Sequence, residues 1–226
     1  MYLVYTYVAI FAVFTGLHLY GSSIKRDSLR APTKPVILLA ILGMYLAWVS
    51  FRNADPMPAL VFAIITSWMG DVLLIPKGVK WFTIGGICFW ISHFLFIYTY
   101  WNSGIEFGRI NPIIIIAIAL VYFVAATITF KYLKKSLPKQ LFVLMYLYLL
   151  TNGAMNSFAW FRLLSGACSP ASGIATAVGA LCFYISDSTL FFVRFDKNSR
   201  IKSHFWVMLT YSLGEFLIVL GLMLLV

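Results

Sequence analysis

The sequence predicts an all-α, polytopic membrane protein in which eight transmembrane helices form a single bundle. Of its 226 residues, 62% are hydrophobic and 11% are charged, and the mean hydropathy is +0.92. A soluble domain of this size does not have such a composition. Apolar runs of about 20 residues, which can span about 30 Å of hydrocarbon, recur along the whole chain. Basic residues, moreover, are concentrated in every second connection between these runs.

The eight expected helices leave little sequence for a soluble domain. They cover residues 2–20, 36–51, 59–75, 81–101, 112–132, 140–161, 171–193 and 205–226. The first run has no charged start and no small-residue cleavage site, so it is expected to be a retained helix. Pro35 is expected to open the second helix, where a proline costs no hydrogen bond. Lys34 would then sit at the helix start, either snorkelling to the interface or binding a lipid phosphate.

The distribution of Lys and Arg predicts the orientation of the chain. Connections after the first, third, fifth and seventh helices hold 14 of the 17 basic residues, and the others hold only Arg52, Arg109 and Arg162. This asymmetry places the odd-numbered connections in the cytosol and both termini on the outer side. The net charge of +10 is therefore attributed to topology and to contacts with lipid headgroups, and no nucleic-acid partner is expected.

Two aspartates lie inside apolar runs, Asp71 in SWMGDVLLI and Asp187 in AVGALCFYISDSTLFF. An ionisable group in hydrocarbon costs roughly 2.5–3.5 kcal/mol and is by default a candidate functional residue. At 1.5 Å per residue, Asp71 lies about 7 Å from the cytosolic end of its helix and Asp187 about 10 Å from Arg194. Because the two depths agree, we expect both carboxyl groups to form one site.

Other polar side chains inside the expected helices are candidates to support this site. Ser67 lies one turn from Asp71, Asn152 and Asn156 share a face, and Tyr211 and Glu215 share another. His93 is expected near the middle of the membrane. Packing explains some of these residues equally well, since amides often join helices and a lone histidine is usually a hydrogen-bonded core residue. His18 is expected at the headgroup level.

The sequence does not predict a cofactor. Its three histidines lie at different depths and make a poor zinc set, although an Asp/His metal hydrolase is left open. Cys88, Cys168 and Cys182 have no metal-type spacing and are interpreted as packing residues.

Several of these residues belong to longer motifs. They are Lys34-Pro35, GDVLL at 70–74, Ser92-His93 followed by Tyr98, GALCFYISDSTL at 179–190 and TYSLGEFLIVL at 210–220. In these motifs and their order, over five of the eight helices, the chain resembles the YhhN-like family, which includes transmembrane protein 86 and comprises the lysoplasmalogenases. It departs from many relatives at Glu215, where they have Gln or His. The resemblance implies an eight-helix enzyme whose substrate is a lysophospholipid. It would hydrolyse the vinyl ether of lysoplasmalogens to a fatty aldehyde and glycerophospho-ethanolamine or -choline.

The implied chemistry suits the two aspartates. Cleavage of a vinyl ether needs an acid to protonate the alkene carbon, negative charge beside the resulting cation, and a base for water. Two close carboxyl groups in a low-dielectric site do not both ionise, so Asp71 and Asp187 can divide these roles, with the assignment left open. Lys34, with Lys77 or Arg194, would hold the phosphate.

Another class of function fits part of the pattern. Acids deep in a small helical bundle also suit a proton-coupled transporter, in which Asp71, Asp187 and Glu215 would relay protons. Transporters often have internal repeats or helices interrupted by glycine or proline. The sequence shows no internal repeat, and no proline is expected inside a helix, so neither feature supports this alternative. A lipid-binding scaffold is a third interpretation. Headgroup preference and the formation of a homodimer are left open.

Overall fold

The computed structural model describes residues 1–196 and 203–225, and this part of the chain is helical, without strands. The α-helices are α1 (Tyr2–Ser23), α2 (Asp27–Arg52), α3 (Pro58–Leu73), α4 (Val79–Asn102), α5 (Pro112–Leu133), α6 (Phe142–Leu164), α7 (Pro170–Phe195) and α8 (His204–Met223). Two short 3-10 helices, Phe107–Arg109 and Lys139–Leu141, precede α5 and α6. Seven α-helices are long and apolar enough to cross a membrane, and α3, with 16 residues, is shorter. The predicted helical, multi-pass membrane protein is thereby confirmed.

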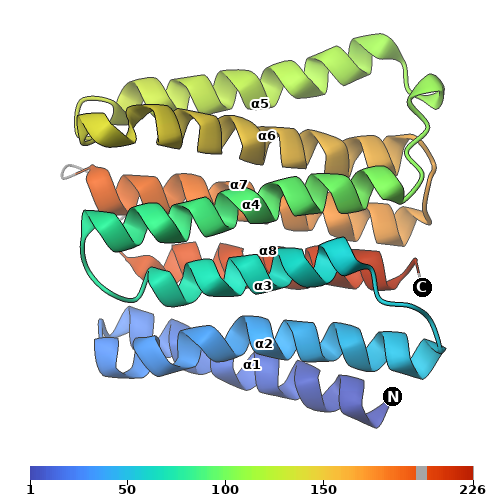
Figure 1. The fold of residues 1–226 in the computed structure, drawn as a ribbon, viewed down its shortest axis with the longest axis horizontal. Helices are drawn as coiled ribbons and strands as arrows, with labels where there is room; N and C mark the ends of the chain where they lie inside the picture. The colour runs from blue at the N-terminus through green and yellow to red at the C-terminus, as the bar shows by residue number, and fades with distance from the viewer. Residues whose placement is uncertain (197–202, 226) are drawn as a thin grey trace.

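The helices lie side by side, with the α1–α2 pair at one edge and the α5–α6 pair at the other (Figure 1). The connections α1–α2, α3–α4 and α5–α6, the end of α7 and the start of α8 lie at one end of the bundle. We call it the basic end, because it carries Lys25, Lys77, Lys135 and Arg194. Both chain ends lie at the opposite end, as the alternation of basic connections predicts. The basic residues Lys197, Arg200 and Lys202, and Val226 of the last expected helix, lie outside the described residues.

Glycines allow close contact between neighbouring helices. A Cβ added to Gly179 of α7 would lie 2.8 Å from the carbonyl oxygen of Gly214 in α8. A Cβ on Gly70 of α3 would lie 2.6 Å from the Phe89 ring and 3.1 Å from the Gly85 carbonyl oxygen in α4. Small residues serve this purpose in membrane helices, where close backbone packing takes the place of the hydrophobic effect. They fix the spacing of the helices that carry the two aspartates.

The predicted start of the second helix at Pro35 is wrong. Helix α2 begins at Asp27, so Lys34 sits in its third turn. Pro32 and Pro35 both lie inside the helix, so the expectation that no helix contains an internal proline is also wrong.

Proline is tolerated inside membrane helices where nearby side chains satisfy the backbone groups that it frees. Pro32 and Pro35 leave the carbonyls four residues earlier, of Ser28 and Ala31, without their helical donors. Side chains add other bonds to the backbone of this region: the Thr33 hydroxyl donates to the Leu29 carbonyl at 2.7 Å, and the Trp68 indole donates to the Pro35 carbonyl at 3.1 Å.

Two basic side chains lie elsewhere than expected. His18, which the sequence suggested would be interfacial, is buried between α1 and α2, with its Nδ1 3.0 Å from the Thr33 hydroxyl. Arg162 does not lie in a connection: α6 continues to Leu164 and buries this arginine completely. Arg162 is buried because α6 extends beyond the apolar run from which it was predicted, and His18 because α2 packs against it. The other expected helices match the observed ones to within three residues at each end.

Candidate functional site

A cavity of about 410 Å³ lies at the basic end and is walled by α1, α2, α3, α4, α7 and α8. We call it the main cavity. Its polar lining includes two buried acids, Asp71 and Asp187, with Ser186 and Tyr211 beside them, and a set of ionisable groups nearer the rim. That set is His18, Asp27, Arg30, Lys34, Lys77, Arg194 and His204. The two aspartates, which the sequence places in different helices 116 residues apart, therefore face one shared space.

Asp71, only 1% exposed, has contacts on both carboxylate oxygens. The Lys34 Nζ lies 3.0 Å from Oδ1, and the Tyr211 hydroxyl donates to Oδ2 at 2.9 Å. The same lysine also reaches the Asp71 backbone oxygen at 3.4 Å. An ammonium and a hydroxyl donor on opposite oxygens favour the ionised form of a carboxyl group. Lys34 is thus positioned to stabilise a negative charge on Asp71.

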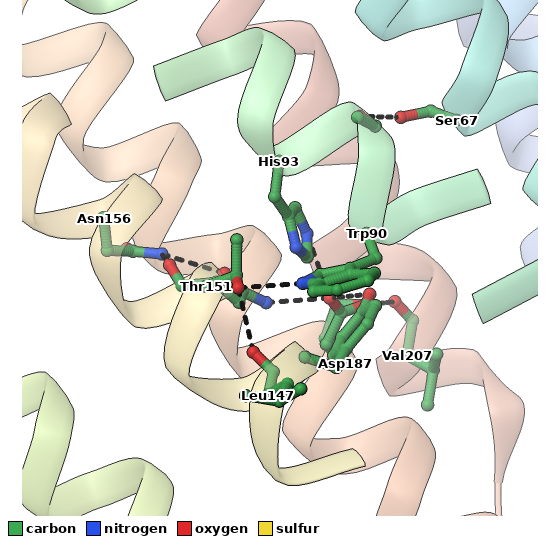
Figure 2. A network of polar contacts seen from close by, with 12 residues as sticks. Ser67, Trp90, His93, Leu147, Thr151, Asn156, Asp187 and Val207 are labelled. Atoms are coloured by element: carbon green, nitrogen blue, oxygen red, sulfur yellow. Dashed lines mark hydrogen bonds and ion pairs between the residues drawn. The ribbon is translucent and has the colours of Figure 1, made fainter. Parts of the chain in front are cut away.

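Asp187 is held differently, because its contacts in the described chain all fall on one oxygen. The Tyr148 hydroxyl donates to Oδ2 at 2.5 Å, the Asn152 amide donates to it at 2.8 Å, and the His93 Nε2 lies 3.6 Å away. Figure 2 shows His93 and Asp187 pointing toward one another between α4 and α7. The remaining oxygen, Oδ1, is the one that can carry or accept a proton on the cavity side.

Helix α6 supplies a row of side chains that fixes Asp187. Tyr148, Asn152 and Asn156 are spaced by four residues and so lie on one face. The Asn156 amide donates to the Asn152 backbone oxygen and to its Oδ1, each at 3.1 Å (Figure 2). Because Oδ1 of Asn152 is thus occupied, its amide nitrogen faces Asp187. Sequence reasoning missed Tyr148, although its spacing from Asn152 and Asn156 was a usable signal.

Two of the expected supporting residues lie behind the cavity wall. Ser67 is bonded to Ser92 of α4, with 2.7 Å between the hydroxyl oxygens. Glu215 is 0% exposed, and neither of its carboxyl oxygens makes a well-formed hydrogen bond among the described residues, although the Ser67 hydroxyl is close enough to act on it. Tyr211, one turn from it, lines the cavity, whereas Glu215 does not. Asp71 and Asp187 are both close enough to act on Glu215 electrostatically, so the three acids form one charge-coupled group.

The three cations expected at a headgroup all line the main cavity, in unequal positions. Lys34 is engaged by Asp71. Lys77 is 88% exposed at the rim, with its Nζ 3.7 Å from Asp27. The guanidinium of Arg194 lies over the Phe82 ring, 5.6 Å from its centroid. Sequence reasoning missed Arg30, which lines the cavity and pairs with Asp27 at 3.0 Å. The rim therefore presents several cations to a ligand.

Histidine and carboxylate side chains such as these can ligate a metal ion when three or more of them converge. Within residues 1–196 and 203–225, no three His, Cys, Asp or Glu side chains form a group that could hold a metal ion. The three cysteines in this range are free thiols.

The chain matches the YhhN family over residues 29–222, which covers most of its length. The match includes every residue assigned above to the two aspartate clusters. No curated protein and no solved structure is significantly similar to the chain. The resemblance seen in the sequence motifs is confirmed: this protein belongs to the YhhN family.

Proposed function

We propose that this protein is a lysoplasmalogenase, an ether hydrolase that acts on the vinyl ether of lysoplasmenyl-ethanolamine or -choline. The products would be a fatty aldehyde and glycerophospho-ethanolamine or -choline. One observation carries the proposal. Two buried carboxyl groups face one cavity beneath a cationic rim, one paired with an ammonium and the other with an oxygen free toward the cavity.

The different contacts of the two aspartates support different roles. Lys34 stabilises negative charge on Asp71, and two neighbouring carboxyl groups in a desolvated site do not both ionise. The proton then falls to Asp187, whose Oδ1 would carry it toward the cavity. Tyr148 and Asn152 hold the other oxygen and thereby fix the direction of Oδ1. Asp187 is accordingly the proposed general acid, and Asp71 is the proposed anion beside the developing cation.

The reaction balances with water as the only other reactant. Asp187 gives its proton to the alkene carbon farther from the ether oxygen, and the ether oxygen and the alkene carbon bonded to it share the positive charge that results. Asp71 stabilises this oxocarbenium-like cation, as a carboxylate does in glycoside hydrolysis. Water then adds to the cationic carbon and returns a proton to Asp187, leaving a hemiacetal. Collapse of the hemiacetal releases the aldehyde and the glycerol hydroxyl.

The position of the cavity supports a lysolipid substrate. In such a lipid the vinyl ether is bonded directly to glycerol, just beneath the phosphate. Lys34, Arg30 and Arg194 line the same cavity as the aspartates and would accept the phosphate near the rim. By the positive-inside rule we place the basic end in the cytosol and both termini on the outer side, so the cavity would open to the inner leaflet.

The proposal is tested with purified protein and two substrates, a lysoplasmenyl lipid and its ester-linked counterpart. We expect aldehyde from the first and no fatty acid from the second. Asp71→Asn and Asp187→Asn should each lower aldehyde release by about 10²–10⁴-fold, the usual contribution of a positioned acid or base. Asp55→Asn, an exposed aspartate in the α2–α3 connection, is the matched control. Fatty acid release, or full activity in either variant, would contradict the proposal.

A proton-coupled transporter remains the second candidate, because of Glu215. This third acid is sealed in the bundle, makes no well-formed hydrogen bond in the described chain, and both aspartates act on it electrostatically. A relay would use such a group, whereas the hydrolysis above does not require it. Protein in vesicles that releases no product from either lipid, but acidifies or alkalises the lumen when a solute is added, would favour this alternative.

A further inference from the structure

A second, smaller cavity adjoins the main one on the far side of Asp187. It has a free volume of about 30 Å³ and lies between α4, the start of α6 and α7. We call it the side slot. Five residues line both spaces: Leu74, Phe82, Phe89, Asp187 and Leu190. Asp187 therefore stands where the two cavities meet, with the cationic rim on one side and the slot on the other.

We propose that the side slot binds the hydrocarbon chain of a single-chain amphiphile whose phosphate lies in the main cavity; this inference rests on the proposed function. The two spaces match the two parts of such a molecule. Apart from Asp187, the slot has only two polar side chains, Thr83 and Tyr148, and the Tyr148 hydroxyl is already bonded to Asp187. The main cavity, by contrast, carries the cations.

The position of Asp187 at the junction of the two cavities determines which bond of the ligand lies next to it. A lysolipid that lays its phosphate among the cations and its chain in the slot must pass Asp187 with the atoms that join glycerol to the chain. These are the atoms of the vinyl ether. The slot would thus set the register of the substrate, bringing the alkene carbon to the acid.

The slot positions the hydrocarbon chain of the ligand but adds little to the binding affinity. A chain that leaves the bilayer for an apolar slot exchanges one apolar environment for another and gains little from the hydrophobic effect. The slot is also narrow, so a chain must displace side chains such as that of Met145, which is unbranched and adapts readily.

Gly86 of α4 offers a way to close the slot without disturbing the helix. It lines the slot, and a Cβ added there would meet no atom within 4 Å. Gly86→Leu should fill the space that the chain needs. Gly16→Leu is the matched control, because Gly16 is an exposed helical glycine of α1 whose added Cβ also meets nothing within 4 Å.

The first measurement locates the chain without relying on catalysis. Purified protein in lipid nanodiscs is labelled with a non-hydrolysable alkyl-ether lysophosphocholine that carries a photoreactive diazirine in its chain, and the labelled peptides are identified by mass spectrometry. We expect the label on the segments of α4 and α6 that line the slot. In Gly86→Leu the slot should carry roughly tenfold less label than in Gly16→Leu, because the leucine occupies the space that the chain would take and overpacking disfavours binding by about this factor. Label confined to the outer faces of α1 and α5 would overturn the proposal. So would equal labelling of the slot by a two-chain phosphatidylcholine probe.

The second measurement is aldehyde release from a lysoplasmenyl lipid. Gly86→Leu should lower it roughly tenfold or more, and Gly16→Leu should leave it unchanged. If no variant, including the wild type, releases aldehyde, the proposed function fails while the labelling still decides the slot. The wild-type labelling map needs no substitution, so it decides the question even if Gly86→Leu does not fold. Full aldehyde release by folded Gly86→Leu would contradict the role of the slot.

Discussion

The bundle buries charged side chains at both ends, in two different ways. Near the end that carries the termini, Arg162 donates hydrogen bonds to neutral oxygens of Ser103, Ser172 and Thr176, at distances from 2.6 to 3.3 Å. The Ser172 hydroxyl in turn donates to the Gly221 carbonyl at 2.6 Å. The guanidinium therefore joins α6 to α7, α8 and the end of α4, and it is 0% exposed. At the basic end, Asp71 and Asp187 are buried as well, but they face a cavity.

The difference between the two ends teaches how a buried charge is used. Each nitrogen of the Arg162 guanidinium has a hydrogen-bond partner, and this arginine lines neither cavity. Its role is therefore interpreted as structural: it holds the helices together. The contacts of Asp187 fall on one oxygen and leave the other available for chemistry. Burial alone therefore does not separate structure from function. The separating property is an uncommitted atom that faces a space a ligand can enter.

The Lys34–Asp71 pair provides the largest expected effect in a test of this comparison. Lys34→Met should destabilise the protein by about 2–3 kcal/mol, less than the roughly 3–5 kcal/mol of sealed pairs because the cavity admits water. Aldehyde release should also fall, since Asp71 loses the cation that favours its charge. Lys34→Met/Asp71→Asn should recover stability without recovering activity, as thermal unfolding and product assays of the two single variants and the double variant would show. Lys131→Met, at an exposed position of α5, is the control.

Arg162→Met tests whether Arg162 contributes to stability alone. We expect a loss of about 1.5–3 kcal/mol in unfolding free energy, because hydrogen bonds from a charged donor are removed from a sealed site. The activity of each folded molecule should be unchanged, since Arg162 lines neither cavity. Thermal unfolding and turnover per folded molecule measure the two quantities. Arg109→Met removes an exposed arginine that pairs with Glu106 at 2.7 Å and should have little effect. Loss of turnover in stably folded Arg162→Met would contradict the distinction.

Tyr148→Phe sharpens the description of Asp187. The variant removes the hydroxyl donor at 2.5 Å from Oδ2 while keeping the ring that packs against His93. Without this donor the direction of Oδ1 is no longer fixed, so turnover should fall roughly tenfold or more. Loss of a buried hydrogen bond should also lower the unfolding free energy by about 1 kcal/mol, as in the control. Tyr45→Phe is the control, because Tyr45 is buried and accepts a bond from the Met57 amide away from both cavities. Equal effects of the two variants on turnover would show that Tyr148 has no specific role at Asp187.

Much of the fold was predictable because hydropathy and charge alternate along the chain over lengths that match a membrane. The start of α2 was not, since the rule that places proline at a helix start was applied to Pro35 while Asp27 already begins the helix. Contacts such as Tyr211 to Asp71 join residues 140 positions apart. No local pattern specifies them; they depend on which helices pack together.

The candidate site shows the same limit. Depth along each helix, counted from the sequence, was enough to place Asp71 and Asp187 near one level, and the structure puts both on the main cavity. The different partners of the two carboxyl groups could not be predicted, because they come from α2, α6 and α8 together. Arg162 was missed because an arginine beside a polar connection was assigned to that connection. Local sequence does not show whether such a residue continues a helix into the interior.

Glu215→Gln has the smallest expected effect and tests the buried acid that lines neither cavity. No Lys or Arg of the described chain lies within ion-pair distance of this sealed carboxyl group, so an ionised Glu215 would be an unpaired buried charge, which costs several kcal/mol. We therefore expect Glu215 to hold a proton, and glutamine should replace it with a change in turnover of less than about threefold. The infrared spectrum should lose a carbonyl band of a protonated carboxyl group, which the exposed control Glu106→Gln should keep. A loss of turnover by two orders of magnitude would instead mean that protons pass through Glu215, and it would join the three acids into one functional relay.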